Sequence, residues 1–206
     1  MQPPEEWFGT IPFTLAFGQG YSATSVQMTS VFATIANQGI RVEPSIVKAI
    51  VEADGTVVDT PDAERSRVVR EDTARQVMAM MEAVTGDGGT APQARIPGYR
   101  VAGKTGTAQV FGLKQGETYK DRAASAERLR DHGWFIAFSP MEQPRIALAA
   151  IVENGGFGSQ SAAPAIKKVL DTYWQIEAEN DPSIGLPTPQ VSEQTANPTT
   201  SRESRP

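Results

Sequence analysis

Apolar side chains recur at helical spacing in two stretches of the chain's first half. A first helix is predicted to begin at Thr24 or Ser25, whose side chains can cap it, and to end at Gly39. A second helix is predicted over residues 71–84, and the TGDGG sequence after it breaks the pattern. The side chains expected to face the core are Met28, Val31, Phe32 and Ile35 in the first helix and Val77, Met81 and Val84 in the second.

Shorter runs are rich in strand-forming residues. Residues 46–51 and 56–58 contain many β-branched side chains and are joined at Asp54-Gly55, a strong hairpin signal. Three longer strands are predicted over residues 99–110, 132–139 and 145–153. The last two of these are joined by the proline-containing turn PMEQP, so they are expected to be neighbours.

The end of the chain divides into a helix and a polar tail. The helix is predicted to open at Ser161 and to accept Pro164 in its first turn. Its core-facing side chains are predicted to be Ile166, Val169, Leu170 and Tyr173. From about Asn180 the composition shifts to proline, serine and threonine, with too few large apolar side chains to offset the entropy of ordering. We therefore predict a globular part, residues 1–178, and a disordered tail, residues 179–206.

Charge and composition exclude several classes of function. The chain has 19 basic and 24 acidic residues and a net charge of -5, without a basic run, so nucleic acid is not an expected partner. Its longest apolar run, residues 146–152, is far too short to span a membrane. There is no cysteine, and the carboxylates are scattered, so neither a metal nor a cofactor is expected. Residues 114–131 carry both charge signs and are expected to form a solvated face, with an exposed helix over residues 119–131. The alternative for this segment is that it docks a partner or a substrate strand.

The sequence GYRVAGKTGTAQV, residues 98–110, matches two functional patterns. Gly98, Gly103 and the Lys104-Thr105 pair fit the phosphate-loop pattern GxxxxGK[ST], while the same Lys-Thr followed by glycine is a signature of penicillin-binding proteins. A phosphate loop needs a buried strand before the first glycine and a helix that begins at the Lys-Thr pair. Prolines precede Gly98 and β-forming residues follow Thr105, so we reject the phosphate loop.

An extended strand would give these residues a different chemistry. Alternation places Thr105 and Thr107 on one side and Lys104 on the other unless the strand twists locally. Gly103 and Gly106 weaken a strand, and glycine in a strand often marks the close approach of a ligand to the backbone. Two hydroxyls and an ammonium beside a cleft can bind a carboxylate, and a backbone N–H can stabilise an oxyanion. The alternative is a plain strand with small residues on one face.

Longer stretches resemble one protein family. GQGYSATSVQMTSVFATIANQG, residues 18–39, resembles a helical segment of class B penicillin-binding proteins, and VAGKTGTAQ, residues 101–109, resembles their third active-site motif. Residues 109–119, 126–140 and 146–156 resemble the elongation-specific members of the family, penicillin-binding protein 2. The similarity runs from about Trp7 to Trp174 and keeps these segments in order.

The resemblance implies a fold and a reaction. The fold is α/β of the α+β type, as in serine β-lactamases and penicillin-binding transpeptidases, with an antiparallel five-stranded sheet flanked by helices. The implied enzyme is a peptidoglycan D,D-transpeptidase. It attacks the D-alanyl-D-alanine end of a stem peptide, forms an acyl-serine and passes the acyl group to an amine of a neighbouring peptide. β-Lactams mimic that substrate, so stem peptides and β-lactams are the expected ligands.

The same resemblance implies roles for four residues. Lys104 supplies positive charge, and the hydroxyls of Thr105 and Thr107 bind the carboxylate of the substrate or drug. The backbone N–H of Thr107 is one of two oxyanion donors, and Gly106 keeps the strand open to approach. His132, the only histidine, is expected to be structural or solvent-facing, since the family assigns proton transfer to lysine and serine.

Two motifs that the family requires are not convincingly present. The only Ser-x-x-Lys match is Ser45 to Lys48, and it lies in a stretch that predicts a strand, where positions three apart point to opposite faces. The chemistry instead needs the serine at a helix start and the lysine one turn later. No Ser-x-Asn tripeptide occurs. We therefore expect the C-terminal part of a transpeptidase domain, incomplete at its N-terminal side and inactive alone, as a truncated or split reading frame would give.

The expected setting follows from the family. The complete protein would lie at the periplasmic face of the bacterial inner membrane and act with the cell-wall elongation machinery. Two other functions stay open: a β-lactam-sensing receptor domain, and a non-catalytic interaction fragment. Oligomeric state and preference among drugs or stem peptides do not follow from the sequence.

Overall fold

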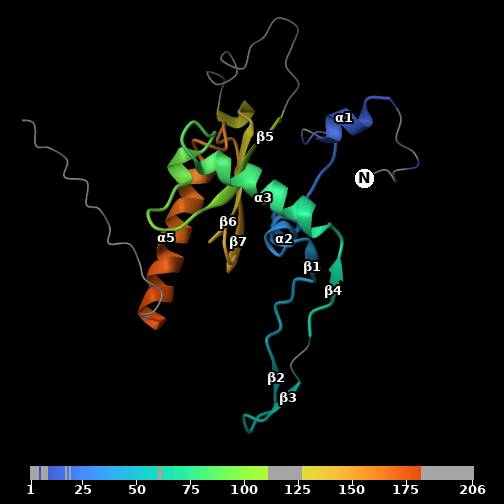
Figure 1. The fold of residues 1–206 in the computed structure, drawn as a ribbon, viewed down its shortest axis with the longest axis vertical. Helices are drawn as coiled ribbons and strands as arrows, with labels where there is room; N and C mark the ends of the chain where they lie inside the picture. The colour runs from blue at the N-terminus through green and yellow to red at the C-terminus, as the bar shows by residue number, and fades with distance from the viewer. Residues whose placement is uncertain are drawn as a thin grey trace, which may run out of the picture.

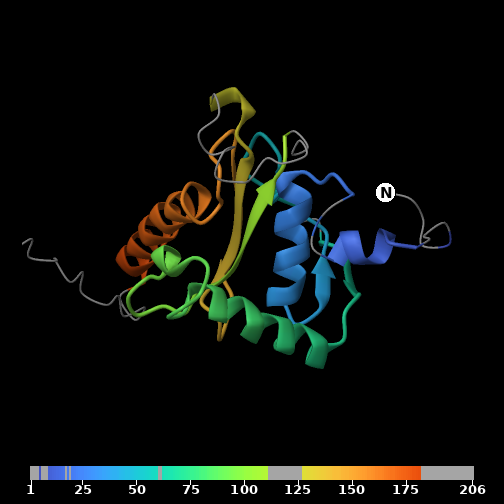
Figure 2. The same cartoon turned by 90° about the horizontal axis from the view of Figure 1, so that it is seen from above.

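An antiparallel three-stranded sheet lies between helices on its two faces in the computed structural model, which describes residues 5, 9–16, 18, 20–59, 62–110 and 127–181. The strand order is β5-β6-β7, with bounds Ala102–Ala108, His132–Ser139 and Ile146–Val152. Figure 2 shows helix α5 on one side of the sheet and helix α2 on the other. The helices of the body are α2 (Ser25–Ala36), α3 (Glu71–Thr85) and α5 (Ala162–Asn180). Helix α3 packs along β5 on the side of α2.

Smaller elements surround this body. Strand β1 (Ile40–Val42) pairs with β4 (Arg65–Arg67), and β2 (Ile50–Val51) pairs with β3 (Val57–Asp59), both antiparallel. Figure 1 shows the β2–β3 pair at the end of an arm that reaches away from the sheet. Single turns complete the described elements: α1 (Ile11–Ala16), η2 (Pro92–Ala94) and η3 (Glu127–Leu129).

The start and the end of α2 are where the sequence places them. Thr24 is the N-cap: its hydroxyl accepts from the Gln27 N–H at 3.2 Å, and the Gln27 side chain accepts from the Thr24 N–H at 2.8 Å. This reciprocal pair is a capping box. Gly39 has a φ of 88°, and a Cβ there would lie 2.1 Å from the carbonyl oxygen of Val69. Only glycine fits this turn.

The core consists of two apolar clusters, one on each face of the sheet. Val101, Phe135 and Ala137 face α5, where they meet buried side chains of that helix. Ala102 and Phe138 face α2 and α3. The buried helix side chains are Ala162, Ala163, Ile166, Leu170 and Trp174 in α5, Ala36 in α2, and Met78 and Met81 in α3. Burial on both faces fixes the strand register.

Two of the predicted core positions are wrong. Val31 is 53% exposed and Val169 is 50% exposed. In α5 the buried stripe continues from Leu170 to Trp174, whose ring stacks on Tyr99 with centroids 4.3 Å apart. A helix buries a stripe about 100° wide, so side chains next to that stripe stay in solvent even when they are apolar.

The predicted strands are present but shorter. The hairpin at Asp54-Gly55 is confirmed, because the Glu52 N–H donates to the Thr56 carbonyl at 2.9 Å and Gly55 has a φ of 91°. Of residues 46–51, however, only Ile50 and Val51 pair with another strand. In the sheet, pairing covers 102–108 of the predicted 99–110 and 146–152 of the predicted 145–153.

Some predictions fall partly outside the described residues. Helix α5 continues to Asn180, two residues into the predicted tail, and residues 182–206 are not described. Of the charged segment 114–131, only residues 127–131 are described, and they contain the turn η3. Among the described helices, none combines the length and the apolar character needed to cross a bilayer.

Candidate active site

The Lys-Thr-Gly sequence lies on β5, one of the two edge strands of the described sheet. Lys104, Thr105 and Thr107 belong to β5, which pairs with β6 and with no other described strand. Residues 102–108 are extended throughout, so no helix begins at the Lys-Thr pair. The rejection of a phosphate loop is thereby confirmed.

The functional side chains alternate between the two faces, as the sequence predicts. Thr105 pairs with Phe135 and Thr107 with Gly133, so both threonines share the face that packs on α5. Lys104 pairs with Ile136 and lies on the face of α2 and α3. The Lys104 side chain is exposed, and its ammonium donates to the carbonyl oxygen of Thr105 at 2.5 Å. This bond holds the charge at the level of Thr105.

Glycines allow neighbouring side chains and backbone to approach the strand closely. A Cβ on Gly103 would lie 2.5 Å from Phe135 Cζ, and one on Gly106 would lie 3.1 Å from Trp134 Cβ. A Cβ on Gly158 would lie 2.6 Å from the carbonyl oxygen of Gly106. The loop after β7 therefore crosses directly over β5 beside the two threonines. The sequence alone does not predict this contact.

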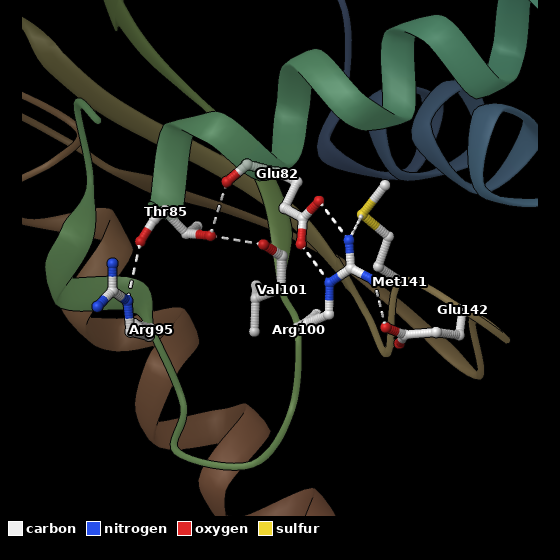
Figure 3. Close-up of polar contacts among 7 residues, drawn as sticks. All are labelled: Glu82, Thr85, Arg95, Arg100, Val101, Met141 and Glu142. Atoms are coloured by element: carbon white, nitrogen blue, oxygen red, sulfur yellow. Dashed lines mark hydrogen bonds and ion pairs between the residues drawn. The ribbon is translucent and has the colours of Figure 1, made fainter. Parts of the chain in front are cut away.

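Hydrogen bonds hold the start of β5 against the end of α3. The buried Thr85 hydroxyl donates to the Val101 carbonyl at 2.6 Å, two of the residues drawn in Figure 3. The Arg95 guanidinium donates to the Thr85 carbonyl at 3.3 Å and pairs with Asp87 at 2.8 Å. Because β5 begins immediately after Val101, these bonds set where the Lys-Thr-Gly strand enters the sheet.

Arg100 ties three segments together at the same place. Its guanidinium contacts Glu82 of α3 through two nitrogens, one of them 2.6 Å from Oε2, and Glu142 of the β6–β7 turn at 2.6 Å (Figure 3). The Met141 N–H donates to the Arg100 carbonyl at 3.0 Å. The hydrogen bonds and charge of Arg100 lower the pKa of Glu82, and the two carboxylates raise the pKa of Arg100. Glu82 and Arg100 are therefore both charged at neutral pH.

One contact at the candidate site comes from the loop after α3. The sequence predicts this loop only as the end of a helix. Thr90 follows the glycine-rich sequence after α3, and its Oγ1 lies 3.3 Å from Oγ1 of Thr105. Either hydroxyl can be the donor. The two adjacent glycines before Thr90 were the only available signal that this segment approaches another part of the backbone.

The other candidate residues are placed away from such chemistry. His132 begins β6, is half-buried, and accepts a 2.9 Å hydrogen bond at Nδ1 from the Asn154 N–H, which fits the expected structural role. Ser45 is exposed and lies on no helix, and among the described residues its hydroxyl bonds to the backbone of Val47 alone. Ser45 and Lys48 are therefore not arranged as a helical Ser-x-x-Lys pair. Within the described residues there is no cluster of three or more potential metal ligands.

A groove of about 670 Å³ lies at a different place. It is lined by the end of α2, by β1 and by the β6–β7 turn, including Asn37, Gln38, Glu142 and Arg145, and by no residue of β5. The Lys-Thr-Gly strand therefore lies apart from this groove, at an edge of the described sheet.

Comparison with known proteins decides the family. The family model described as the penicillin binding protein transpeptidase domain matches residues 2–171. This chain belongs to the penicillin-binding protein transpeptidase family. The predicted family and its α+β fold are thereby confirmed.

Individual relatives agree with this assignment. The chain is 38% identical to the peptidoglycan D,D-transpeptidase MrdA of Acinetobacter baumannii, over 86% of this chain and 26% of the relative. It is 35% identical to the penicillin-binding protein PbpB of Mycobacterium tuberculosis, over 92% of this chain and 28% of the relative. The chain thus spans little more than a quarter of the length of these relatives.

Solved structures match the fold as well. Penicillin binding protein 3 from Mycobacterium tuberculosis, complexed with ampicillin, superposes with a TM-score of 0.70 at 34% identity, covering 92% of this chain and 42% of that chain. The same protein has also been solved complexed with aztreonam. The described sheet and helices are therefore part of a penicillin-binding transpeptidase fold.

Proposed function

We propose that this chain supplies the carboxylate-binding strand of a peptidoglycan D,D-transpeptidase. This proposal rests on the outer edge of β5, which no described strand covers: Thr105 and Thr107 share one face of the strand there, and the Lys104 ammonium reaches the Thr105 carbonyl oxygen from the other. Lys104 attracts the anionic end of the stem peptide, and the two hydroxyls donate to its terminal carboxylate. The N–H of Thr107 is one oxyanion donor, and the absence of a side chain at Gly106 leaves the strand accessible.

The serine nucleophile of the proposed reaction belongs to residues outside these 206. Its Oγ attacks the carbonyl carbon of the penultimate D-alanine, the C–N bond breaks, and the terminal D-alanine leaves with a proton on its amine. An amine of a second stem peptide then attacks the acyl-serine, forms the new amide and returns the serine. A β-lactam acylates the same serine, but its ring opens instead of releasing a leaving group. This chain alone is therefore expected to be inactive.

The proposal includes a cellular setting. The MrdA name of several relatives and the resemblance of residues 109–119 to penicillin-binding protein 2 support a role in cell-wall elongation. We place the complete enzyme at the periplasmic face of the inner membrane, in contact with the elongation machinery.

Fluorescent penicillin tests the proposed function. The chain is expressed together with a second polypeptide that carries the family's Ser-x-x-Lys and Ser-x-Asn motifs, and covalent label is read on a denaturing gel. We expect label on the second polypeptide only when both are present. Lys104→Ala should reduce the labelling rate at least about tenfold, the scale of one lost charge-assisted hydrogen bond. Lys48→Ala, which removes the same charge from the β2–β3 arm, should leave the rate unchanged.

Two results would contradict the proposal. Label on this chain alone would place a nucleophile within it. Equal labelling with and without Lys104 would mean that β5 does not contribute to the site.

A second candidate, a non-catalytic interaction fragment, is supported by the exposed aliphatic side chains of the β2–β3 arm. They are Ile46, Val47, Ile50, Val51, Val57 and Val58. This function predicts a folded chain that never promotes penicillin labelling in the paired experiment.

A further inference from the structure

Thr90 lies beside the candidate site although it comes from a different part of the chain. It follows the glycine-rich end of α3, fifteen residues before Thr105, and the two hydroxyl oxygens are 3.3 Å apart. Thr90 is exposed and Thr105 is half-buried on β5. The Thr90 hydroxyl therefore borders the surface that an anionic ligand of Thr105 would occupy.

The backbone on both sides of Thr90 is packed against the end of α3. A Cβ on Gly89 would lie 2.3 Å from the carbonyl oxygens of Ala83 and Val84, so the chain passes there only because residue 89 is a glycine. On the other side, the Ala91 N–H donates to the Val84 carbonyl at 2.9 Å, and the Ala91 side chain is fully buried. Thr90 is thus presented by a segment with little freedom to move.

The same segment is tied to the loop that crosses β5. The Gln93 side-chain amide donates to the carbonyl of Ser159, next to Gly158, whose backbone lies against Gly106 and Trp134. Two loops from distant parts of the sequence therefore meet at the strand and hold Thr90 in place from the second side. A residue held in this way can fix the direction of a neighbouring group at a low entropic cost.

We infer that Thr90 is a positioning residue that orients the Thr105 hydroxyl toward the substrate carboxylate; this inference rests on the proposed function. A carboxylate is only an acceptor, so a hydroxyl that binds it must donate its single proton to it. Thr105 Oγ1 then has lone pairs free to accept, and the nearby Thr90 hydroxyl is the donor. The result is a chain from the Thr90 O–H to the Thr105 O–H to the carboxylate, in which each bond polarises the next.

Removing the Thr90 hydroxyl should weaken carboxylate binding without removing the direct contact. A neutral hydrogen bond that stabilises one bound state changes a dissociation constant by roughly two- to tenfold. Thr90→Val has nearly the same shape and loses the hydroxyl, and with it the donor to Thr105. Thr90→Ser keeps the donor, so it should restore binding to within about twofold of the wild-type value.

The experiment is an NMR titration of the isotope-labelled 206-residue chain, which follows the amides of β5. The probes are N-acetyl-D-alanyl-D-alanine and its C-terminal amide, which has no carboxylate. For the acid we expect the dissociation constant to rise in Thr90→Val, to rise further in Thr105→Val, and to recover in Thr90→Ser. The amide probe should bind more weakly than the acid, and equally to wild type and Thr90→Val. It has no carboxylate that could accept a hydrogen bond from the Thr105 hydroxyl.

The outcomes separate the inference from the function on which it rests. If Thr105→Val weakens binding of the acid and Thr90→Val does not, Thr90 has no positioning role and the proposed site stands. If Thr90→Val weakens the acid and the amide equally, or Thr90→Ser fails to recover, the effect is only structural and the inference is wrong. If the wild-type chain shows no saturable shift with the acid, both the site and the inference are overturned.

Discussion

Gly103 has less room for a side chain than Gly106, the other glycine of the Lys-Thr-Gly strand. A Cβ there would lie 2.5 Å from Cζ of Phe135 and 3.0 Å from the carbonyl oxygen of Ile136, and Phe135 is fully buried. Gly103→Ala should therefore lower the free energy of unfolding by about 1–3 kcal/mol, the usual effect of overpacking a core. Gly106→Ala, with its nearest contact at 3.1 Å, is the matched control and should cost less than Gly103→Ala. Urea denaturation measures both, and equal losses would mean that the core beside Gly103 can shift.

For single residues, the sequence predicts the strand face on which a side chain lies better than it predicts the contacts of that side chain. The alternation of Lys104 against Thr105 and Thr107 follows from strand geometry alone, and the structure confirms it. The contact between Thr90 and Thr105 does not follow, because it depends on how a loop after α3 folds back over a strand that comes later in the chain. Val169 shows the same limit: an apolar residue beside a helix stripe gives no signal of which way the helix is turned.

Among the elements, α3, the start of β5 and the β6–β7 turn are joined by Arg100. Its two carboxylate partners, Glu82 and Glu142, come from the helix and from the turn. The pKa of Glu82 is lowered by Arg100 from its ordinary value of 4.5, so the folded state binds this proton less tightly than the unfolded state. The stabilisation is therefore present above pH 4.5 and is lost as the pH falls through the lower folded-state pKa.

This linkage predicts a pH-dependent effect of one substitution. Glu82→Gln should destabilise the chain at pH 7 and less at pH 3, because the stabilisation from the pair begins to be lost as the pH falls below 4.5. Because Arg100 is about half exposed, salt should screen the pair, and 1 M NaCl should shrink the difference at pH 7. Arg75→Gln, at an exposed i,i+4 pair on the same helix, is the control. A loss for Glu82→Gln that is the same at both pH values would assign the effect to packing instead of charge.

Elements that bury a face were predicted well, and elements without a neighbour were not. Strand β6 matches its predicted bounds at both ends, since it is central and has a strand on each side. Of the strand predicted over residues 46–51, only Ile50 and Val51 are paired, because β propensity leads to a strand only where another strand pairs with it. Boundaries thus follow tertiary pairing, which local sequence does not contain.

In the molecule as a whole, the layered body and the arm differ in how they use apolar residues. The body buries its large side chains between sheet and helices, with Phe135, Leu170 and Trp174 at 2% exposure or less. On the arm, Ile46 is fully exposed, and Val57 and Val58 are 56% and 51% exposed. The family resemblance predicted the body, including its antiparallel sheet and flanking helices. It gave no indication that the hairpin would stand away from that body with aliphatic side chains in solvent.

Replacing the arm's exposed side chains should change surface behaviour but not stability. Ile46→Thr, Val57→Thr and Val58→Thr keep β-branching and remove apolar surface, so each should alter the free energy of unfolding by no more than about 0.5 kcal/mol. Binding of a hydrophobic dye and self-association in light scattering should both fall in the triple variant, because exposed apolar surface promotes association. Ile166→Thr is the control, since Ile166 is 2% exposed and its loss should cost more than about 2 kcal/mol. If the triple variant lost stability as the control does, the arm would have to pack against the body in solution. Unchanged dye binding would instead place the chain's accessible apolar surface outside the arm.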